Sequence, residues 1–181
     1  GLGDIGGTFA RKMNALGSKV TGVRRNSAKR PEYLEGLYQM DALEKLLPDA
    51  DIVVCTLPGT SETYHLLDER KIRLMKPTAV LVNIGRGSLI PAQDLIRVLE
   101  DGAIAGAAID VAEQEPLPED SKLWEVPNLI ITPHVAGNYH TQDILDRAVE
   151  IAGENFQAFL EGGKLRNEVD FATGYRKIAC N

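Results

Sequence analysis

The chain opens with the sequence GLGDIGGTFARKMNAL, residues 1–16. Gly1, Gly3 and Gly6 form the pattern G-x-G-x-x-G, and the residues behind it place apolar side chains on one stripe at helical spacing. The glycines therefore stand where a loop enters a helix, an arrangement that can hold a pyrophosphate against backbone N–H groups. An ordinary tight turn before a helix would give the same pattern, so the motif alone leaves both interpretations open.

Length and charge narrow the class of protein. At 181 residues the chain suits one domain with a sizeable core, with or without an appendage. Its net charge of −6 argues against a nucleic-acid partner, which requires a basic face. No apolar run approaches the roughly 20 residues that span a bilayer, and Cys, His and acidic residues show no metal-binding spacing. We expect a cytoplasmic protein with no nucleic-acid or membrane partner and no metal.

Apolar segments alternate between strand and helix patterns along the chain. Strands are expected at residues 19–23, 51–57, 79–83, 104–110 and 129–132, the second of them buried on both faces. Asp41–Glu44 has the form of a capping box, Asp68 that of a helix cap, and Pro91 suits a first helical position. This alternation predicts an α/β fold with a doubly wound parallel sheet of the Rossmann type.

The predicted domain has an unusual beginning. A dinucleotide fingerprint normally follows a buried central strand, and no residue precedes Gly1 in this sequence. We expect a dinucleotide-binding domain over residues 1–163 that lacks its first strand, followed by a tail over residues 164–181. A long helix over residues 140–160 closes the domain. The strands at 19–23 and 51–57 would then lack a ladder partner, so we expect the isolated chain to be poorly stable or to self-associate.

Two arginines follow the first predicted strand. Arg24 and Arg25 stand where a nucleotide-binding fold usually places an acid that holds the ribose 2′-hydroxyl, close to the expected offset of about 20 residues. Two guanidinium groups at this place would bind a 2′-phosphate, which favours NADP over NAD. The alternative is that both are solvated surface charges.

Ligands of doubly wound sheets bind at the carboxyl ends of the strands, where this chain places titratable side chains. Hydride transfer between a nicotinamide and C2 of a 2-hydroxy acid needs a proton donor and acceptor, for which His134 is suited. It also needs a planar cation for the substrate carboxylate, such as Arg86, and Glu115 could fix the tautomer of the histidine. Each residue has a simpler explanation, as a loop histidine, a surface cation or a loop acid.

Six segments in order resemble the signatures of the D-isomer-specific 2-hydroxyacid dehydrogenases. They are Gly1–Gly6, Leu57–Thr63, Asn83–Gly87, Ala108–Val111, Glu115–Pro118 and Thr132–Gly137. The resemblance implies that Arg86 binds the substrate carboxylate, His134 is the general acid and base, and Glu115 is its carboxylate partner. It also implies that Asp110 contacts the nicotinamide side of the cofactor. With the glycine motif and the two arginines included, the expected cofactor-binding residues are Gly1, Gly3, Asp4, Ile5, Gly6, Arg24, Arg25, Leu57, Pro58, Thr63, Ile84, Gly85, Arg86, Asp110, His134 and Gly137.

The resemblance also implies a substrate class and a missing part. Relatives with arginine at the position of Arg24 include glyoxylate and hydroxypyruvate reductases, which tend to use NADP. Family members carry a substrate-binding domain ahead of the glycine loop, so we expect weak or no activity of this chain alone. The resemblance also implies that the full-length form is a homodimer. Three other interpretations stay open: a formate dehydrogenase, disfavoured by Glu115, a corepressor-like nucleotide-binding module without turnover, and a non-functional gene fragment.

Overall fold

A computed structural model describes residues 1–26, 29–137, 142–172 and 174–176. The chain divides into two compact units, Gly1–Pro133 and His134–Asn181. The second unit combines the expected long helix with the expected tail, and the predicted domain boundary at residue 163 stays a prediction. In the part of the chain that is described, no helix is long and apolar enough to cross a membrane.

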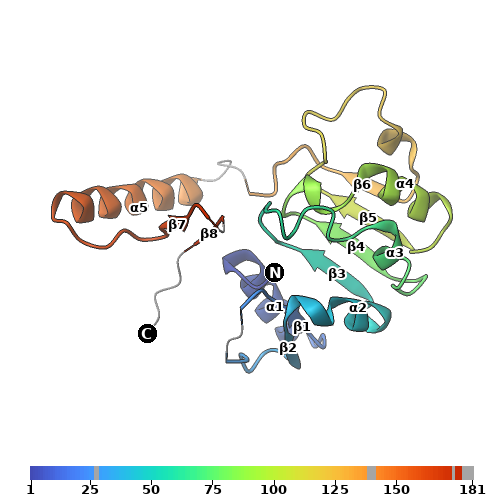
Figure 1. The fold of residues 1–181 in the computed structure, drawn as a ribbon, viewed down its shortest axis with the longest axis horizontal. Helices are drawn as coiled ribbons and strands as arrows, with labels where there is room; N and C mark the ends of the chain where they lie inside the picture. The colour runs from blue at the N-terminus through green and yellow to red at the C-terminus, as the bar shows by residue number, and fades with distance from the viewer. Residues whose placement is uncertain (27–28, 138–141, 173, 177–181) are drawn as a thin grey trace. The chain divides into compact units, whose positions relative to one another are not determined.

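The first unit is built on a parallel sheet with the strand order β3-β4-β5-β6 (Figure 1). Its strands are β3 (Ile52–Cys55), β4 (Val80–Asn83), β5 (Gly106–Ile109) and β6 (Leu129–Ile131). Cys55 pairs with Asn83, Asn83 with Ile109, and Ile109 with Ile131, so all four strands end at the same edge. This confirms the predicted parallel sheet, and it brings the residues that follow the four strands together.

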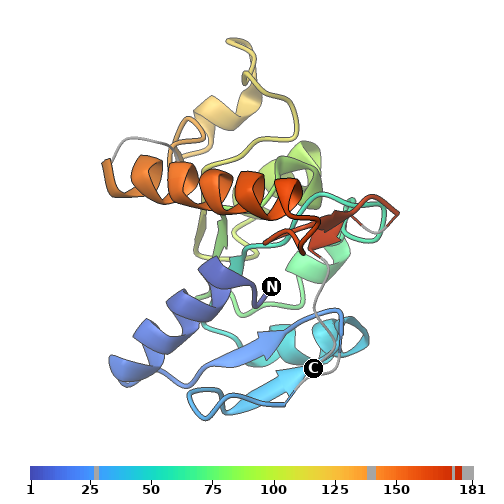
Figure 2. The ribbon, with the colours of Figure 1, turned by 90° about the vertical axis from the view of Figure 1, so that its left-hand side faces the viewer.

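A second, two-stranded parallel sheet joins β1 (Thr21–Val23) to β2 (Gly36–Tyr38). Figure 2 shows helix α1 (Asp4–Ala15) beside it. Within the described residues β1 pairs with β2 alone and β3 with β4 alone. The edges of β1 and β3 that the sequence predicts to be unpaired therefore have no partner strand in the described parts of the chain.

Short helices and 3₁₀ turns connect the strands of this unit. The helices are α2 (Leu43–Leu46), α3 (Glu69–Ile72) and α4 (Ala92–Glu100), and the turns are Met40–Ala42, Leu47–Asp49, Gly87–Leu89 and Lys122–Glu125. Helix α4 buries Leu95, Ile96, Val98 and Leu99 against the sheet core. Since burying one such side chain contributes about 1.5–3 kcal/mol, this face fixes α4 firmly.

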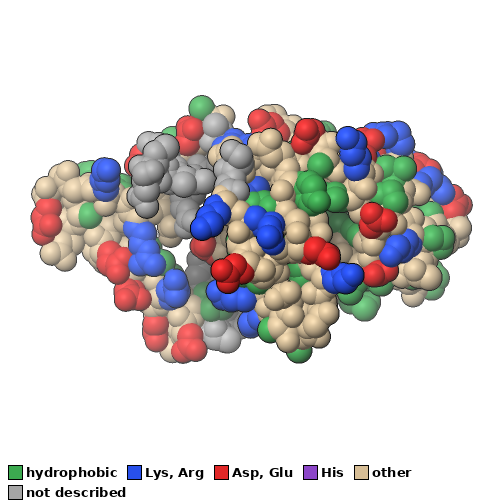
Figure 3. Space-filling view, turned by 90° about the horizontal axis from the view of Figure 1, so that it is seen from below, with side chains coloured by type: hydrophobic (Ala, Val, Ile, Leu, Met, Phe, Trp, Pro, Cys, Tyr) green, Lys and Arg blue, Asp and Glu red, His purple; other side chains and the backbone are tan. Residues whose placement is uncertain are grey.

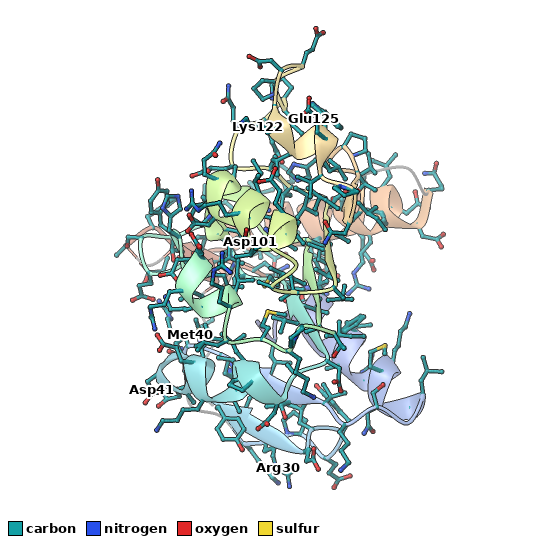
Figure 4. All side chains as sticks on the ribbon, turned by 90° about the vertical axis from the view of Figure 1, so that its right-hand side faces the viewer. Arg30, Met40, Asp41, Asp101, Lys122 and Glu125 are labelled. Carbon is teal, nitrogen blue, oxygen red and sulfur yellow. The ribbon has the colours of Figure 1, made fainter. Side chains whose placement is uncertain are left out.

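Local predictions about the helix ends had mixed outcomes. Asp68 caps α3 by accepting a hydrogen bond from the Lys71 N–H at 2.9 Å, as predicted. The capping box predicted at Asp41–Glu44 is wrong, because the 3₁₀ turn over Met40–Ala42 takes the place of the first helical turn and the Asp41 side chain is exposed (Figure 4). Pro91 precedes α4 with an extended backbone, so it is the cap rather than the first helical residue.

Strand β3 is less buried than predicted. Ile52 is 55% exposed, and Val53 and Val54 are half-buried. The expectation of burial on both faces is wrong because β3 is the outer strand of its sheet, with a neighbour on one side alone among the described strands.

Basic and acidic side chains are interspersed over the face seen in Figure 3.

The second unit contains helix α5 (Gln142–Leu160) and a hairpin of β7 (Val169–Asp170) and β8 (Tyr175–Arg176). The first residues of the predicted helix, 140–141, lie outside the described residues. The side chain of Asn155 exchanges two hydrogen bonds with the backbone of Arg166, which fixes the segment after the helix. The apolar stripe of α5 is exposed within the chain, with Phe156 at 66% and Phe159 at 70%.

Candidate active site

The glycine loop has the geometry of an anion-binding helix start. Gly3 is the N-cap of α1 and makes no side-chain cap bond, and a Cβ at Gly3 would meet nothing within 4 Å. At Gly6 the situation is the reverse, because a Cβ would lie 2.1 Å from the Gly1 carbonyl oxygen and 2.6 Å from Thr56 Oγ1. Gly6 therefore allows the helix to pack closely, and Gly3 leaves the approach to the helix N-terminus open.

Strand β3 ends against this loop. Thr56 Oγ1 donates a hydrogen bond to the Gly1 carbonyl at 3.0 Å, and Leu57 Cδ2 lies 3.0 Å from the position of a Cβ on Gly1. The next strand end reaches the same residue, since a Cβ at Gly85 would lie 2.6 Å from the Leu57 carbonyl oxygen. Leu57 is thus the shared neighbour of the glycine loop and of the Ile84–Arg86 turn.

Asn83 holds the Arg86 turn in shape. This side chain is 1% exposed; its Oδ1 accepts from the Gly85 N–H at 3.1 Å, and its Nδ2 donates to the Arg86 carbonyl at 3.0 Å. The Arg86 guanidinium donates to the Gly85 carbonyl at 2.7 Å. Sequence reasoning assigned no role to Asn83 or Thr56, although a polar residue that ends an apolar strand run is the signal that could have singled them out.

The loop after β3 is closed by Thr63. Its side chain is buried, and its hydroxyl donates to the Pro58 carbonyl at 2.7 Å and accepts from the Thr60 N–H at 2.9 Å. The loop lies against the Arg86 stem, because a Cβ at Gly59 would be 3.3 Å from Arg86 Cγ. In this structure the predicted cofactor residues Pro58 and Thr63 therefore shape the wall beside Arg86.

The end of β5 carries two acids. Asp110 is 5% exposed and accepts a hydrogen bond from Thr132 Oγ1 at 2.5 Å. It follows β5, whose neighbours β4 and β6 end at Asn83 and Ile131. Five residues on, Glu115 Oε1 accepts from the Ala112 N–H at 2.9 Å, which folds the loop into a tight turn. Both carboxylates thus belong to the segment that leaves the carboxyl edge of the sheet.

The two arginines lie after β1. Gly22 of this strand packs on the glycine loop, since a Cβ there would lie 2.2 Å from Leu2 Cδ1. The Arg24 N–H donates to the Tyr38 carbonyl at 3.0 Å, and the Arg25 guanidinium lies 3.9 Å from Glu62 Oε2 of the loop after β3. Arg25 is thus placed beside the same loop that borders the glycine turn.

Most of the predicted site residues therefore belong to one edge of the first unit. The glycine loop with Asp4 and Ile5, the Leu57–Thr63 loop, the Ile84–Arg86 turn and Asp110 are joined by the contacts above. His134 and Gly137 belong to the second unit, where His134 has a left-handed backbone with φ of 54°.

A parallel sheet whose carboxyl edge faces a glycine loop at a helix N-terminus defines a Rossmann-type dinucleotide-binding domain. Residues 1–136 match the family model for the NAD-binding domain of the D-isomer specific 2-hydroxyacid dehydrogenases. The chain belongs to this family.

Relatives of known name agree with this assignment. A glyoxylate reductase of Korarchaeum cryptofilum is 38% identical over 163 residues, which are 90% of this chain and 48% of that protein. A D-isomer specific 2-hydroxyacid dehydrogenase of Xanthobacter autotrophicus Py2, solved with NADPH and MES, matches with a TM-score of 0.88 at 34% identity, over 97% of this chain and 70% of that one.

A third relative is the NADPH-dependent glyoxylate/hydroxypyruvate reductase of Sinorhizobium meliloti, solved with NADP and sulfate. It matches with a TM-score of 0.87 at 30% identity, over 97% of this chain and 55% of that one. The chain spans about half the length of the curated relatives that it matches.

Proposed function

We propose that this chain forms the nucleotide-binding and catalytic part of an oxidoreductase of the EC 1.1.1 type. The reaction is hydride transfer between NAD(P)H and a small 2-oxo acid, of the glyoxylate or hydroxypyruvate type, to give the D-2-hydroxy acid. The observation that carries the proposal is the sharing of Leu57 by the glycine loop and the Arg86 turn. That contact supports the proposal because it joins the turn that carries Arg86 to the segment that borders the glycine loop.

The residues present fit a dinucleotide. The open space at Gly3 and the N-terminal N–H groups of α1 would receive the pyrophosphate, and Leu57 and the Ile84–Arg86 turn would border the nicotinamide half. Arg24 and Arg25 would bind a 2′-phosphate, so NADP is preferred to NAD. Support comes from the two relatives solved with NADPH and NADP. When bound, the nicotinamide supplies the hydride.

The remaining chemistry falls to side chains of this chain. The Arg86 guanidinium binds the substrate carboxylate in bidentate fashion and draws electron density from the neighbouring carbonyl. As the general acid, His134 would give the proton of one ring nitrogen to the C2 oxygen when C2 accepts a hydride. In this proposal Glu115 would accept a hydrogen bond from the other ring nitrogen and stabilise the charged imidazole, and Asp110 would lie beside the nicotinamide.

The connection along the chain supports the role of His134. Thr132 is fixed to Asp110 by its hydroxyl and to the Ile109 carbonyl by its N–H, at 2.5 and 3.0 Å. His134 follows Thr132 by two residues in the sequence.

The test is His134→Ala in the natural full-length protein. General acid and base catalysis is worth about 10²–10⁴-fold, so glyoxylate or hydroxypyruvate reduction should fall by that factor. NADPH binding, followed by the nucleotide's fluorescence, should change little. Turnover that survives in the variant would remove the catalytic assignment, and a nucleotide-binding module without turnover would then be the better account.

We also propose that the full-length protein is a cytoplasmic homodimer. The exposed apolar side chains of α5 support a dimer, because apolar patches of this kind on a single chain mark interaction sites. Sedimentation velocity on the full-length protein tests the proposal, and a monomer at micromolar concentration would refute it.

A further inference from the structure

A histidine and a carboxylate pair beside the candidate site, and the proposed reaction does not use them. His65 Nε2 lies 2.6 Å from Glu113 Oε1, with 35% and 32% of the two side chains exposed. The second carboxylate oxygen of Glu113 accepts a hydrogen bond from the Ala92 N–H at 2.9 Å, at the start of α4. One carboxylate therefore joins three segments: the loop after β3, the start of α4 and the loop after β5.

His65 is held in an unusual conformation. Its φ is 51°, in the left-handed region that costs a residue with a Cβ about 1–2 kcal/mol, and its ring stacks on Tyr64 at 3.8 Å between centroids. The backbone N–H of His65 donates to the Ser88 carbonyl at 2.8 Å. Ser88 lies two residues after Arg86. These bonds aim the imidazole at Glu113 and tie the loop after β3 to the segment that follows Arg86.

The segment that carries Glu113 packs closely against the turn after Arg86. A Cβ at Gly87 would lie 1.8 Å from the Ala112 carbonyl oxygen and 2.6 Å from the Glu113 nitrogen. The Ala112 N–H in turn donates to Glu115 Oε1. Two backbone segments are thus in direct contact: the turn that carries Arg86, and the Ala112–Glu115 segment that carries Glu113 and Glu115.

The charge state of Glu113 favours its hydrogen bonds to His65 and to the Ala92 N–H. Partial burial by itself raises the pKa of this carboxyl, but the Ala92 N–H and the pairing with His65 outweigh burial and lower the pKa below its usual value. The side chain is consequently an anion at neutral pH, which strengthens both hydrogen bonds.

We infer that Glu113 and His65 are positioning residues for the reaction: they bridge the loop after β3 to the Ala112–Glu115 segment and so fix Glu115 relative to Arg86. The inference rests on the proposed function, because it concerns how two of the residues assigned to that reaction are held. Misplacement of a reacting group by about 1 Å can cost about 10²-fold in rate, so loosening this segment should appear in kcat.

The experiment compares variants in the natural full-length protein with NADPH and glyoxylate. Glu113→Ala should lower kcat by about 10-fold or more, with the Kd for NADPH changed less than about 2-fold. His65→Asn should lower kcat similarly, because asparagine tolerates the left-handed backbone but removes the imidazole. The double variant should be no slower than Glu113→Ala, as expected for two residues that act through one contact.

Two further variants separate positioning from a general loss of structure. Glu113→Gln keeps the length of the side chain and an acceptor for the Ala92 N–H, so kcat should lie between wild type and Glu113→Ala. Glu119→Ala removes an exposed acid from the same loop and should behave as wild type. Wild-type kcat in Glu113→Ala, or a loss of kcat matched by losses in NADPH affinity and unfolding temperature, would overturn the inference.

The same assay distinguishes failure of the proposed function from failure of the positioning role. Full turnover in His134→Ala would refute the proposed function itself. An inactive His134→Ala together with an unaffected Glu113→Ala would refute the positioning role alone.

Discussion

Alanine substitution at three neighbouring glycines should separate dinucleotide binding from folding. Gly3 has an extended backbone, with φ of −77° and ψ of −159°, and a Cβ there meets nothing within 4 Å. Gly3→Ala should therefore keep the free energy of unfolding within about 0.5 kcal/mol of wild type. The new methyl group would nevertheless stand where a pyrophosphate approaches the α1 N–H groups. Losing one hydrogen bond to a charged group, worth about 1.5–3 kcal/mol, lowers the affinity about 10- to 150-fold.

Gly6 and Gly7 provide the contrast. At Gly6 the Cβ would lie 2.1 Å from a backbone oxygen, which no rotamer change can relieve. Such overpacking costs about 1–3 kcal/mol or more, and for a chain of this length each kcal/mol lowers the unfolding temperature by about 2–4 °C. At Gly7, inside α1, the nearest atom is the Tyr33 hydroxyl oxygen at 3.6 Å. Gly7→Ala should gain about 0.4–1 kcal/mol through helix propensity and lower backbone entropy of the unfolded chain.

Two measurements decide the outcome. Thermal unfolding by circular dichroism gives stability, and titration of NADPH followed by fluorescence gives affinity. The expected pattern is normal stability with weak binding for Gly3→Ala, low stability for Gly6→Ala, and slightly raised stability with normal binding for Gly7→Ala. If Gly3→Ala bound NADPH with wild-type affinity, the loop would not be a pyrophosphate seat and the assignment of the glycine motif would fail.

Three further predictions concern the cofactor's phosphate, acid stability and the unpaired strand edges. Arg25→Ala should weaken NADPH binding about 10-fold and leave NADH binding unchanged, while Glu62→Gln, which removes the carboxylate beside Arg25, should tighten NADPH binding up to about 5-fold; competitive titration would show either effect. The Arg97 hydrogen bond, then that of Arg73, lowers the pKa of Glu69. Its contribution to stability is therefore complete above its unfolded pKa and is lost as the pH falls through the lower folded value, so thermal unfolding from pH 7 to pH 3 should show wild type losing its advantage over Glu69→Gln in acid. The 181-residue chain alone should self-associate through the edges of β1 and β3, and a cooperative monomer in sedimentation velocity with normal turnover would contradict this.

Sequence reasoning succeeded where the rule involved is a rule about parallel sheets. The apolar runs ending at Leu57, Asn83 and Asp110 had to end at one edge once the strands were taken as parallel, so the candidate residues could be grouped without coordinates. It failed at Asp41, where the capping pattern is local and a 3₁₀ turn competes with it. His65 and Glu113 are 48 residues apart, and only the fold brings them to 2.6 Å. Before that contact is seen, Glu113 is one loop acid among several.

The contacts that set the site are contacts of backbone with backbone. A Cβ at Gly6, Gly85 or Gly87 would lie 2.1, 2.6 or 1.8 Å from the carbonyl oxygen of Gly1, Leu57 or Ala112. Because a carbonyl oxygen cannot move without its strand or loop, each contact fixes a whole segment rather than one side chain. The contacts at Gly85 and Gly87 set the Arg86 turn against the Leu57 segment and the Ala112–Glu115 segment through backbone, while the Thr56 hydroxyl adds a bond to the glycine loop and Asn83 adds bonds within the turn. A bridge such as Glu113 to His65 then has only the remaining motion of the Ala112–Glu115 segment to suppress, which is why its removal should lower kcat and spare nucleotide binding.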